Sequence, residues 1–322
     1  MNNAPIPLHT PRKRFALTDV RAGRLDMPRR VLGYGQEGVG KSTFAAGAPS
    51  PVFMCPENGT PHLNIQRLPT PETWDDALEI ASLLVGDGTG FETLVIDPVN
   101  WLELLCWGRV IGGPGAAPNE DTADAIAQHG GGFNKGYDAA VSHWRNMVGV
   151  LERVWRSGKN VVLLGHSHVK AFNDPTGVSY DRYELQMHHK ASGLLKQWAD
   201  DVLFMRHEVL AKAERGKVRA VATGARVMHT QWDRAWDAKT RAALPEELPL
   251  SWADYWSAVE AGKDRAPALR EEIRSLLPMV EASTRSKVEA AMVAAGDSAD
   301  RLAEIANRVR VITASALKEN DA

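Results

Sequence analysis

The sequence predicts an α/β fold in which helices flank a mainly parallel β-sheet, followed by a small helical C-terminal region. Three observations predict this architecture. A glycine-rich, phosphate-binding loop joins a short apolar run to a helical stretch near residue 40. Short apolar runs then alternate with helical stretches as far as residue 205, which is the pattern of parallel strands joined by helices. Beyond residue 250 the hydrophobic spacing is helical.

The phosphate-binding loop is the most specific feature of the chain, because it fits the pattern G-x-x-x-x-G-K-S/T. Its glycines let the backbone turn back and point N–H groups at an anion, and the next helix adds the positive end of its dipole. We expect Lys41 to reach the β- and γ-phosphates of a nucleotide, and the Ser42 hydroxyl to ligate Mg²⁺. The expected nucleotide-binding residues are Gly35, Gln36, Glu37, Gly38, Val39, Gly40, Lys41, Ser42 and Thr43.

The other elements follow from hydrophobic patterning. Apolar residues recur at three- and four-residue intervals in the helices expected over 71–84 and 137–155, and Pro71 suits the first turn of the former. Residues 217–230 predict a hairpin of edge strands that turns around Gly224. Five short apolar runs predict buried strands, at 30–34, 52–55, 93–97, 160–165 and 201–205.

A change of composition at residues 244–249 separates the sheet-forming part from the C-terminal part. Helices are expected over 252–261 and 266–317, with a break at Gly296. The basic residues near the N-terminus suit either a solvated tail or a docking arm. The expected regions are an N-terminal arm (1–28), an α/β core (29–262) and a helical C-terminal region (263–322).

The composition excludes several classes of protein. The net charge of −2 gives no overall field toward nucleic acid or anionic membranes, so such contacts must be local. The cysteines, Cys55 and Cys106, form neither a disulfide framework nor a metal pattern, which indicates a reducing compartment. No signal peptide and no run of about 18 apolar residues occurs, so we expect a cytoplasmic protein with no membrane partner.

Two carboxylates and one histidine follow predicted strands and are candidates for chemistry. Asp97 ends the third strand, where a carboxylate can support Mg²⁺, although a turn-starting aspartate before a proline reads similarly. Glu57 follows the second strand at the ligand-binding edge of the sheet and could polarise an attacking water; a polar turn residue is the alternative. His166 ends the fourth strand. It points toward the γ-phosphate if that strand lies beside the strand that leads into the phosphate-binding loop.

Several further side chains could contribute. His166 and His168 share a strand face, but no further metal ligand follows at a suitable spacing, so a metal site is disfavoured. Phe133 and Tyr137 are candidates for stacking on unpaired bases. A cation from a neighbouring subunit could stabilise transition-state charge, and the candidates are Lys239 and Arg241, then Lys190.

Taken together, these motifs resemble the phage-encoded RecA-like ATPases, a group often labelled phage nucleotide-binding proteins. The resemblance implies nucleotide contact at Lys41, Ser42 and Thr43, a catalytic base at Glu57 and metal support at Asp97. The polymerisation hook of RecA is absent from residues 14–18, so filament formation is not implied. The resemblance covers roughly residues 29–256, through residues 35–43, 56–59, 94–97, 133–137, 164–166, 198–200, 238–241 and 244–249.

We therefore expect a cytoplasmic, Mg²⁺-dependent ATP hydrolase with a RecA-like core that works as a homo-oligomeric ring or filament. Some members of the group act in recombination or single-strand annealing. Single-stranded DNA would accordingly lie against two mobile segments, 112–137 and 170–190. One alternative is a P-loop kinase acting on a small molecule, which is disfavoured because residues 170–190 hold only Arg182 as a lid arginine. Another is a nucleotide-switched assembly protein.

Overall fold

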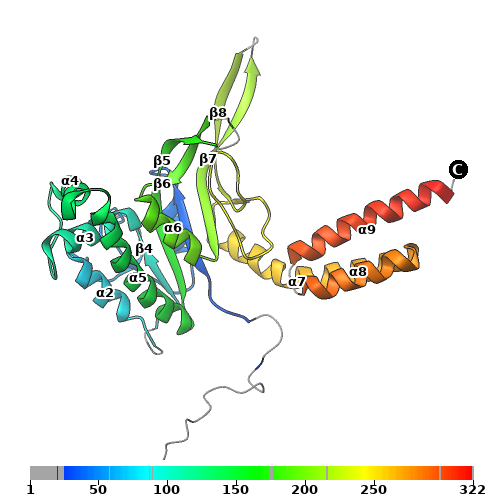
Figure 1. Ribbon diagram of the computed structural model, residues 1–322, viewed down its shortest axis with the longest axis horizontal. Coiled ribbons are helices and arrows are strands. Elements are labelled where there is room, and N and C mark those ends of the chain that lie inside the picture. Colours follow the sequence, from blue (N-terminus) through cyan, green and yellow to red (C-terminus); the bar gives the residue numbers. More distant parts are fainter. Residues whose placement is uncertain are drawn as a thin grey trace, which may run out of the picture.

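A computed structural model describes residues 20 and 25–320, apart from residues 58, 87, 89, 175, 176, 178, 215, 216, 297 and 298. Most of the expected N-terminal arm, 1–28, lies outside the described residues. Within the described part of the chain, nine strands form one sheet between helices (Figure 1). The strands are β1 (Arg30–Gly35), β2 (Pro51–Met54), β3 (Gln66–Arg67), β4 (Thr93–Ile96), β5 (Asn160–Asn173), β6 (Ser179–Leu185), β7 (Asp201–Glu214), β8 (Lys217–His229) and β9 (Glu247–Pro249).

The sheet has the order β3-β2-β4-β5-β1-β7-β8-β9, with β6 paired to β5. Neighbours from β3 to β7 are parallel, whereas β6, β8 and β9 add antiparallel pairs. The mainly parallel sheet flanked by helices is confirmed. The helices are α1 (Lys41–Ala46), α2 (Trp74–Ser82), α3 (Val99–Gly112), α4 (Thr122–Gln128), α5 (Lys135–Arg156), α6 (His189–Trp198), α7 (Trp252–Leu276), α8 (Ala282–Ala295) and α9 (Ala299–Asn320).

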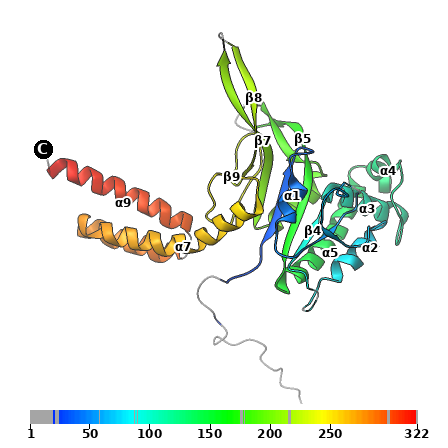
Figure 2. The ribbon, with the colours of Figure 1, turned by 180° about the vertical axis from the view of Figure 1, so that it is seen from behind.

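Alternate residues of the strands face two separate cores. Leu32 faces a core formed with α2, α3, α5 and α6, and Val31 faces a core formed with α1 and α7. Figure 2 views the second side, where α1 and the start of α7 lie against the sheet. On that side Phe44 of α1 packs on Trp252 and Tyr255 of α7, with ring centroids 5.3 and 5.9 Å apart. The helix that follows the phosphate-binding loop is therefore packed directly against the start of the C-terminal region.

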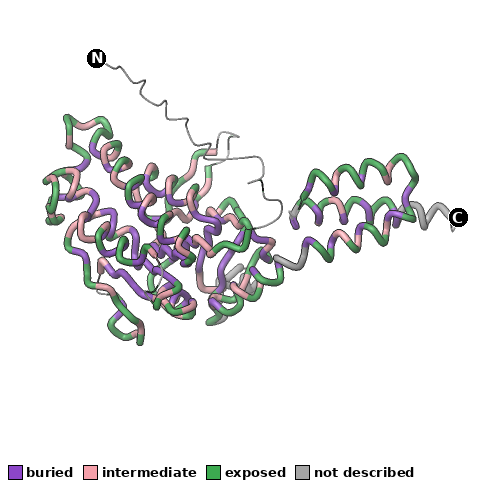
Figure 3. The backbone as a smooth tube through the Cα atoms, turned by 90° about the horizontal axis from the view of Figure 1, so that it is seen from below, coloured by how far each residue is buried: buried purple, intermediate pink, exposed green. Residues whose placement is uncertain are grey.

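The C-terminal helices form a third core of their own, which begins at Ala266 and joins α7, α8 and α9. Figure 3 shows these helices extending away from the sheet, with exposed residues along their outer sides. Helix α7 is continuous from Trp252 to Leu276 and so passes through the expected boundary at residue 262. The helix break at Gly296 is confirmed, because α8 ends at Ala295 with Gly296 as its C-cap. None of the described helices is long and apolar enough to cross a membrane.

The expected turn of the edge hairpin at Gly224 is wrong. Strand β8 runs through Gly224, and the hairpin joins the end of β7 at Glu214 to the start of β8 at Lys217. Gly224 has a φ of 82° and lies where the pairing with β7 shifts between His207 and Val209. Its left-handed backbone therefore serves a β-bulge and not a turn.

The expectation of a loop is wrong for most of the described residues of the segment 170–190. The end of β5, strand β6 and the start of α6 occupy this segment, and β5 and β6 pair from Ser167–Leu185 to Asn173–Ser179. The segment reads as a loop in the sequence because its polar residues lie on a two-stranded extension outside the parallel sheet. Residues 112–137 contain α4 and the first turn of α5 between glycine-rich turns. Pro71, expected in the first turn of its helix, lies before α2, which begins at Trp74 with a capping box formed by Thr73 and Asp76.

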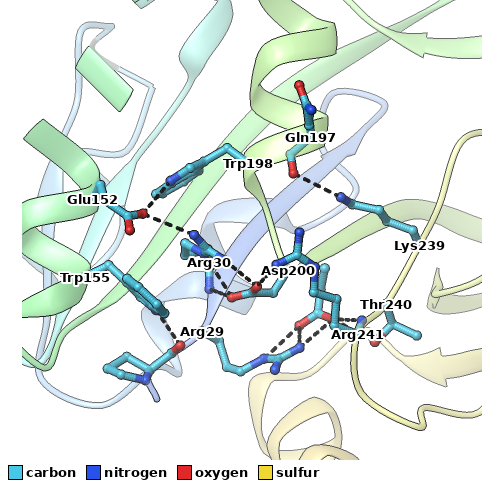
Figure 4. Close-up of polar contacts among 12 residues, drawn as sticks. Arg29, Arg30, Glu152, Trp155, Gln197, Trp198, Asp200, Lys239, Thr240 and Arg241 are labelled. Carbon is cyan, nitrogen blue, oxygen red and sulfur yellow. Dashed lines mark hydrogen bonds and ion pairs between the residues drawn. The ribbon is translucent and has the colours of Figure 1, made fainter. Parts of the chain in front are cut away.

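The starts of β1 and β7 are tied together by buried ion pairs (Figure 4). The Arg29 guanidinium donates to both carboxylate oxygens of Asp201 at 2.6–3.0 Å, and the Tyr255 hydroxyl donates to Asp201 at 2.5 Å. Arg30 pairs in the same way with Asp200, at 2.8–3.1 Å. Asp201 is fully buried, so these bonds join the sheet to α7 without water.

Replacing Asp201 by alanine is expected to lower the free energy of unfolding by about 3 kcal/mol, because Arg29 and Tyr255 lose their shared acceptor in a buried site. Urea unfolding followed by circular dichroism measures the effect. The matched control is Glu271→Ala, whose carboxylate is 79% exposed, with an expected change below about 0.5 kcal/mol. Equal stability of the two variants would contradict the expectation.

Candidate nucleotide-binding site

A cavity of about 470 Å³ opens at the carboxyl edge of the parallel strands. Residues of the phosphate-binding loop line it, together with residues that follow β2 and β4, one residue of β5 and one residue of β8. Gly38 and Gly40 have φ angles of 71° and 106°, which only glycine adopts easily. Gly35 lies against the Met205 carbonyl, and an added Cβ there would meet that oxygen at 2.0 Å. The glycines of the motif are thus required by the shape of the loop.

Lys41 extends across the loop and is 94% buried, with a relative exposure of 6%. Its Nζ donates to the carbonyl oxygens of Gly35 and Gln36 at 3.0 and 2.8 Å. Burial lowers the pKa of Lys41 to about 8, although Asp97, Glu37 and Glu57 act in the opposite direction. The ammonium is therefore a partly desolvated cation in the lining of the cavity.

Ser42 and Asp97 lie together at the position expected for a metal ion. The Ser42 hydroxyl donates to Asp97 Oδ2 at 2.5 Å, and Asp97 is 6% exposed. Burial raises the pKa of Asp97, while Ser42 and Lys41 lower it. No cluster of three His, Cys, Asp or Glu residues able to hold a metal occurs among the described residues. A hydroxyl and one carboxylate suit Mg²⁺, which keeps several waters and uses phosphate oxygens as further ligands.

Glu57, which follows β2, and His166 of β5 complete the cavity from the two strands on either side of β4. Burial, then Asp97 and Glu37, raise the pKa of Glu57, which makes its carboxylate a stronger base. His166 pairs with Gly35 across β5 and β1, so its strand does lie beside the strand of the phosphate-binding loop. Its Nδ1 is 3.4 Å from Lys41 Nζ, and burial and Lys41 lower its pKa. The imidazole is therefore neutral at neutral pH.

The remaining candidates lie outside this cavity. His168 lines a different cavity from His166, so the two histidines do not form a metal site. Arg241 donates to Asp200 at 3.1 Å and Lys239 to the Gln197 carbonyl at 3.5 Å, both at the network of Figure 4. Lys190 pairs with Asp138. None of these cations reaches the cavity of its own chain, and a role in a neighbouring subunit stays a prediction.

The sequence reasoning missed one charged residue of the cavity, Arg226 of β8. No local signal could have identified it, because Arg226 reaches the cavity only through the pairing of β8 with β7 and of β7 with β1. Arg182 is also clarified, since it is 7% exposed and pairs with Asp237. A side chain held in this way does not suit the mobile lid that a small-molecule kinase would need.

ATP affinity is expected to fall as the pH rises above 8, because the protein then loses the Lys41 proton whose pKa is about 8. An ordinary lysine stays charged to about pH 10, so the loss begins about two pH units early. Calorimetric titration at several pH values should show Kd rising by up to about tenfold per unit above pH 8. In Lys41→Ala this dependence should vanish. A constant Kd for the wild type between about pH 7 and 9.5 would contradict the expectation.

Comparison with known proteins supports the fold that the phosphate-binding loop and the sheet indicate. A family model described as an AAA domain, AAA_24, matches residues 27–242. Together with the strand order, this match confirms the expected RecA-like P-loop fold. Solved structures similar to the chain include a KaiC-like protein from the hyperthermophilic archaeon Pyrococcus horikoshii, with 15% identity over 69% of this chain and 85% of that chain and a TM-score of 0.35.

The similar solved structures also include the flagellar accessory protein FlaH from Methanocaldococcus jannaschii, with 10% identity over 63% of this chain and 77% of that chain and a TM-score of 0.33. No curated protein matches the chain significantly in sequence.

Proposed function

Because the chain belongs to the AAA domain family, we propose that it is a Mg²⁺-dependent ATP hydrolase whose turnover is coupled to single-stranded DNA. One observation carries the enzymatic part: residues far apart in the sequence surround one cavity at the end of the parallel strands. A cation, a hydroxyl, two carboxylates and a neutral imidazole meet there, from Lys41, Ser42, Asp97, Glu57 and His166.

The arrangement suits hydrolysis of the terminal phosphate. The loop amides and Lys41 bind the triphosphate, and Ser42 and Asp97 hold the site of Mg²⁺, which when bound neutralises phosphate charge. Glu57 orients a water and accepts its proton as the water oxygen attacks the γ-phosphorus. The bond to the bridging oxygen breaks, and ADP and inorganic phosphate leave. His166 contacts the γ-phosphate position and changes its hydrogen bonds when phosphate departs.

In a homo-oligomer, a neighbouring subunit supplies a further cation to the nucleotide cavity. Loose transition states of phosphoryl transfer are stabilised by additional cations, often donated by a neighbouring subunit. Lys239 and Arg241 lie outside the cavity of their own chain at the start of β1 and β7. We assign one of them to the site of the adjacent subunit in a ring or filament, with Lys190 as the next candidate.

An aromatic cleft, defined as the cavity of about 570 Å³ between α3 and the segment that follows β6, supports the proposal for DNA. Trp101 on its wall is 44% exposed. Tyr137, from one of the two segments expected to bind DNA, stacks on the cleft residue His188 at 4.0 Å and 2°. The His168 Nδ1 in the cleft is buried without a hydrogen-bond partner among the described residues. Stacking faces beside polar groups suit unpaired bases.

The aromatic cleft adjoins the nucleotide cavity through one side chain. Asn100 lines the cleft, and its Oδ1 accepts a hydrogen bond from the backbone N–H of His166 at 3.2 Å. A change at His166 on phosphate release would therefore be transmitted to the cleft through Asn100. The finer proposal, a part in phage DNA recombination or single-strand annealing, is supported by the motif resemblance over residues 29–256.

The test measures phosphate release with and without a short single-stranded oligonucleotide, alongside gel shifts at increasing salt. We expect stimulated turnover and salt-sensitive binding. Trp101→Ala should weaken DNA binding about tenfold, since one stacked base contributes about 1–3 kcal/mol. The matched control is Trp232→Ala, which removes a tryptophan that is 59% exposed and lies outside the cleft. No stimulation and no DNA binding would dismiss the DNA proposal and leave the ATPase proposal standing.

A further inference from the structure

Arg226 is the second cation of the nucleotide cavity, beside Lys41. Its backbone is fixed on both sides, because Arg226 pairs with His207 of β7 and its carbonyl accepts the N–H of Leu250 at 2.9 Å. Its side chain extends over the phosphate-binding loop. A Cβ placed on Gly40 would lie 2.9 Å from Arg226 Nη1 and 3.7 Å from its Cδ. The guanidinium thus lies directly against the loop that cradles phosphate.

The carboxylates of the cavity outnumber its cations, so Arg226 is suited to supply positive charge to a bound phosphate. Its lining carries three carboxylates, Glu37, Glu57 and Asp97, against the cations Lys41 and Arg226. Lys41 is partly desolvated and already bonded to two backbone carbonyls. Arg226 is exposed, and among the described residues no carboxylate forms an ion pair with it. An arginine keeps its charge at any physiological pH and offers a planar fork of donors that matches phosphate oxygens.

We propose that Arg226 binds the phosphates of the nucleotide within its own chain and joins β8 to the phosphate-binding loop when the nucleotide is bound. This inference rests on the proposed function and assigns one more residue to the same site. Arg226 differs from Lys239 and Arg241, which lie at the network of Figure 4 and outside the nucleotide cavity of their own chain. Its contribution is therefore expected even at protein concentrations where the chain is monomeric.

The experiment compares Arg226→Ala, Arg226→Lys and wild type by calorimetric titration with ATP, ADP and adenosine in the presence of Mg²⁺. Arg226→Ala should bind ATP about 10- to 100-fold more weakly, as expected for loss of charged hydrogen bonds, and Arg226→Lys should recover part of that loss. Adenosine affinity should stay unchanged. Arg153→Ala is the matched control, because Arg153 is an exposed arginine of α5 that has no place in the cavity.

Equal ATP affinity for Arg226→Ala and wild type would overturn the inference, and so would an equal loss for adenosine, which would place the contact at the sugar or base. Failure of the proposed function would give a different result, because wild type itself would then neither bind nor hydrolyse ATP. If Arg226→Ala unfolds at a lower temperature than wild type, Arg226→Gln, which keeps two of the three methylene groups of the arginine stem, gives the same comparison without the charge.

Discussion

Lys41→Ala should weaken ATP binding by about 100- to 1,000-fold and leave turnover at the background of the assay. The reason is electrostatic. Without Lys41, the cavity presents Glu37, Glu57 and Asp97 to a polyanion, and the remaining cation is exposed Arg226. Calorimetric titration gives the Kd, and a phosphate-release assay gives the turnover.

The control for this variant is Lys287→Ala, which removes an exposed lysine from α8. It should match wild type in both measurements. Because Lys41 also donates to the Gly35 and Gln36 carbonyls, a thermal melt must accompany the titration. A folded Lys41→Ala protein that bound ATP with wild-type affinity would contradict the assignment of this cavity to the nucleotide.

Glu57→Gln should separate hydrolysis from binding. Loss of a general base lowers turnover by about 10²- to 10⁴-fold. The amide keeps the shape of the side chain and removes one negative charge near the phosphates, so ATP affinity should be unchanged or slightly higher. Single-turnover phosphate release and calorimetric titration measure the two quantities, with Glu79→Gln on the exposed side of α2 as the control.

Two outcomes for Glu57→Gln would contradict the assignment. Unchanged turnover would show that another group activates water. A parallel loss of affinity and turnover would show that Glu57 positions the nucleotide. The same variant also tests the nucleotide-switched assembly protein considered from the sequence, because assembly that depends only on ATP binding would survive the substitution.

The parallel strands were predictable because burial on both faces leaves a clear trace in the sequence. Strands β4 and β5 appear as apolar runs since residues such as Val95 and Val162 contact helices on one face while their neighbours contact helices on the other. The extensions of β5 and β7 beyond the parallel part of the sheet leave no such trace. Their residues pair with β6 and β8 in two-stranded ribbons, where polar and apolar residues read like a loop.

The residues of the candidate site also divide into those that the sequence predicted and those that it did not. Lys41, Ser42, Asp97 and Glu57 follow predicted strands, and the rule that ligands bind at the carboxyl edge of a parallel sheet brings them together. The placement of His166 depended on the strand order, and the pairing of His166 with Gly35 meets that condition. Of the aromatic cleft, the sequence indicated the segment 170–190, which includes His188, and Tyr137, which stacks on His188, whereas Trp101 belongs to α3, a helix that was not expected.

The packing of Phe44 on Trp252 and Tyr255 couples the position of α7 to that of α1. A helix of 25 residues is about 37 Å long, so a tilt of about 5° at its base displaces its far end by about 3 Å. The base of this lever touches the helix that follows the phosphate-binding loop, and its far end carries α8 and α9 (Figure 1). A rearrangement of α1 that tilted α7 as a rigid body would therefore displace α8 and α9 further than it displaces the base of α7.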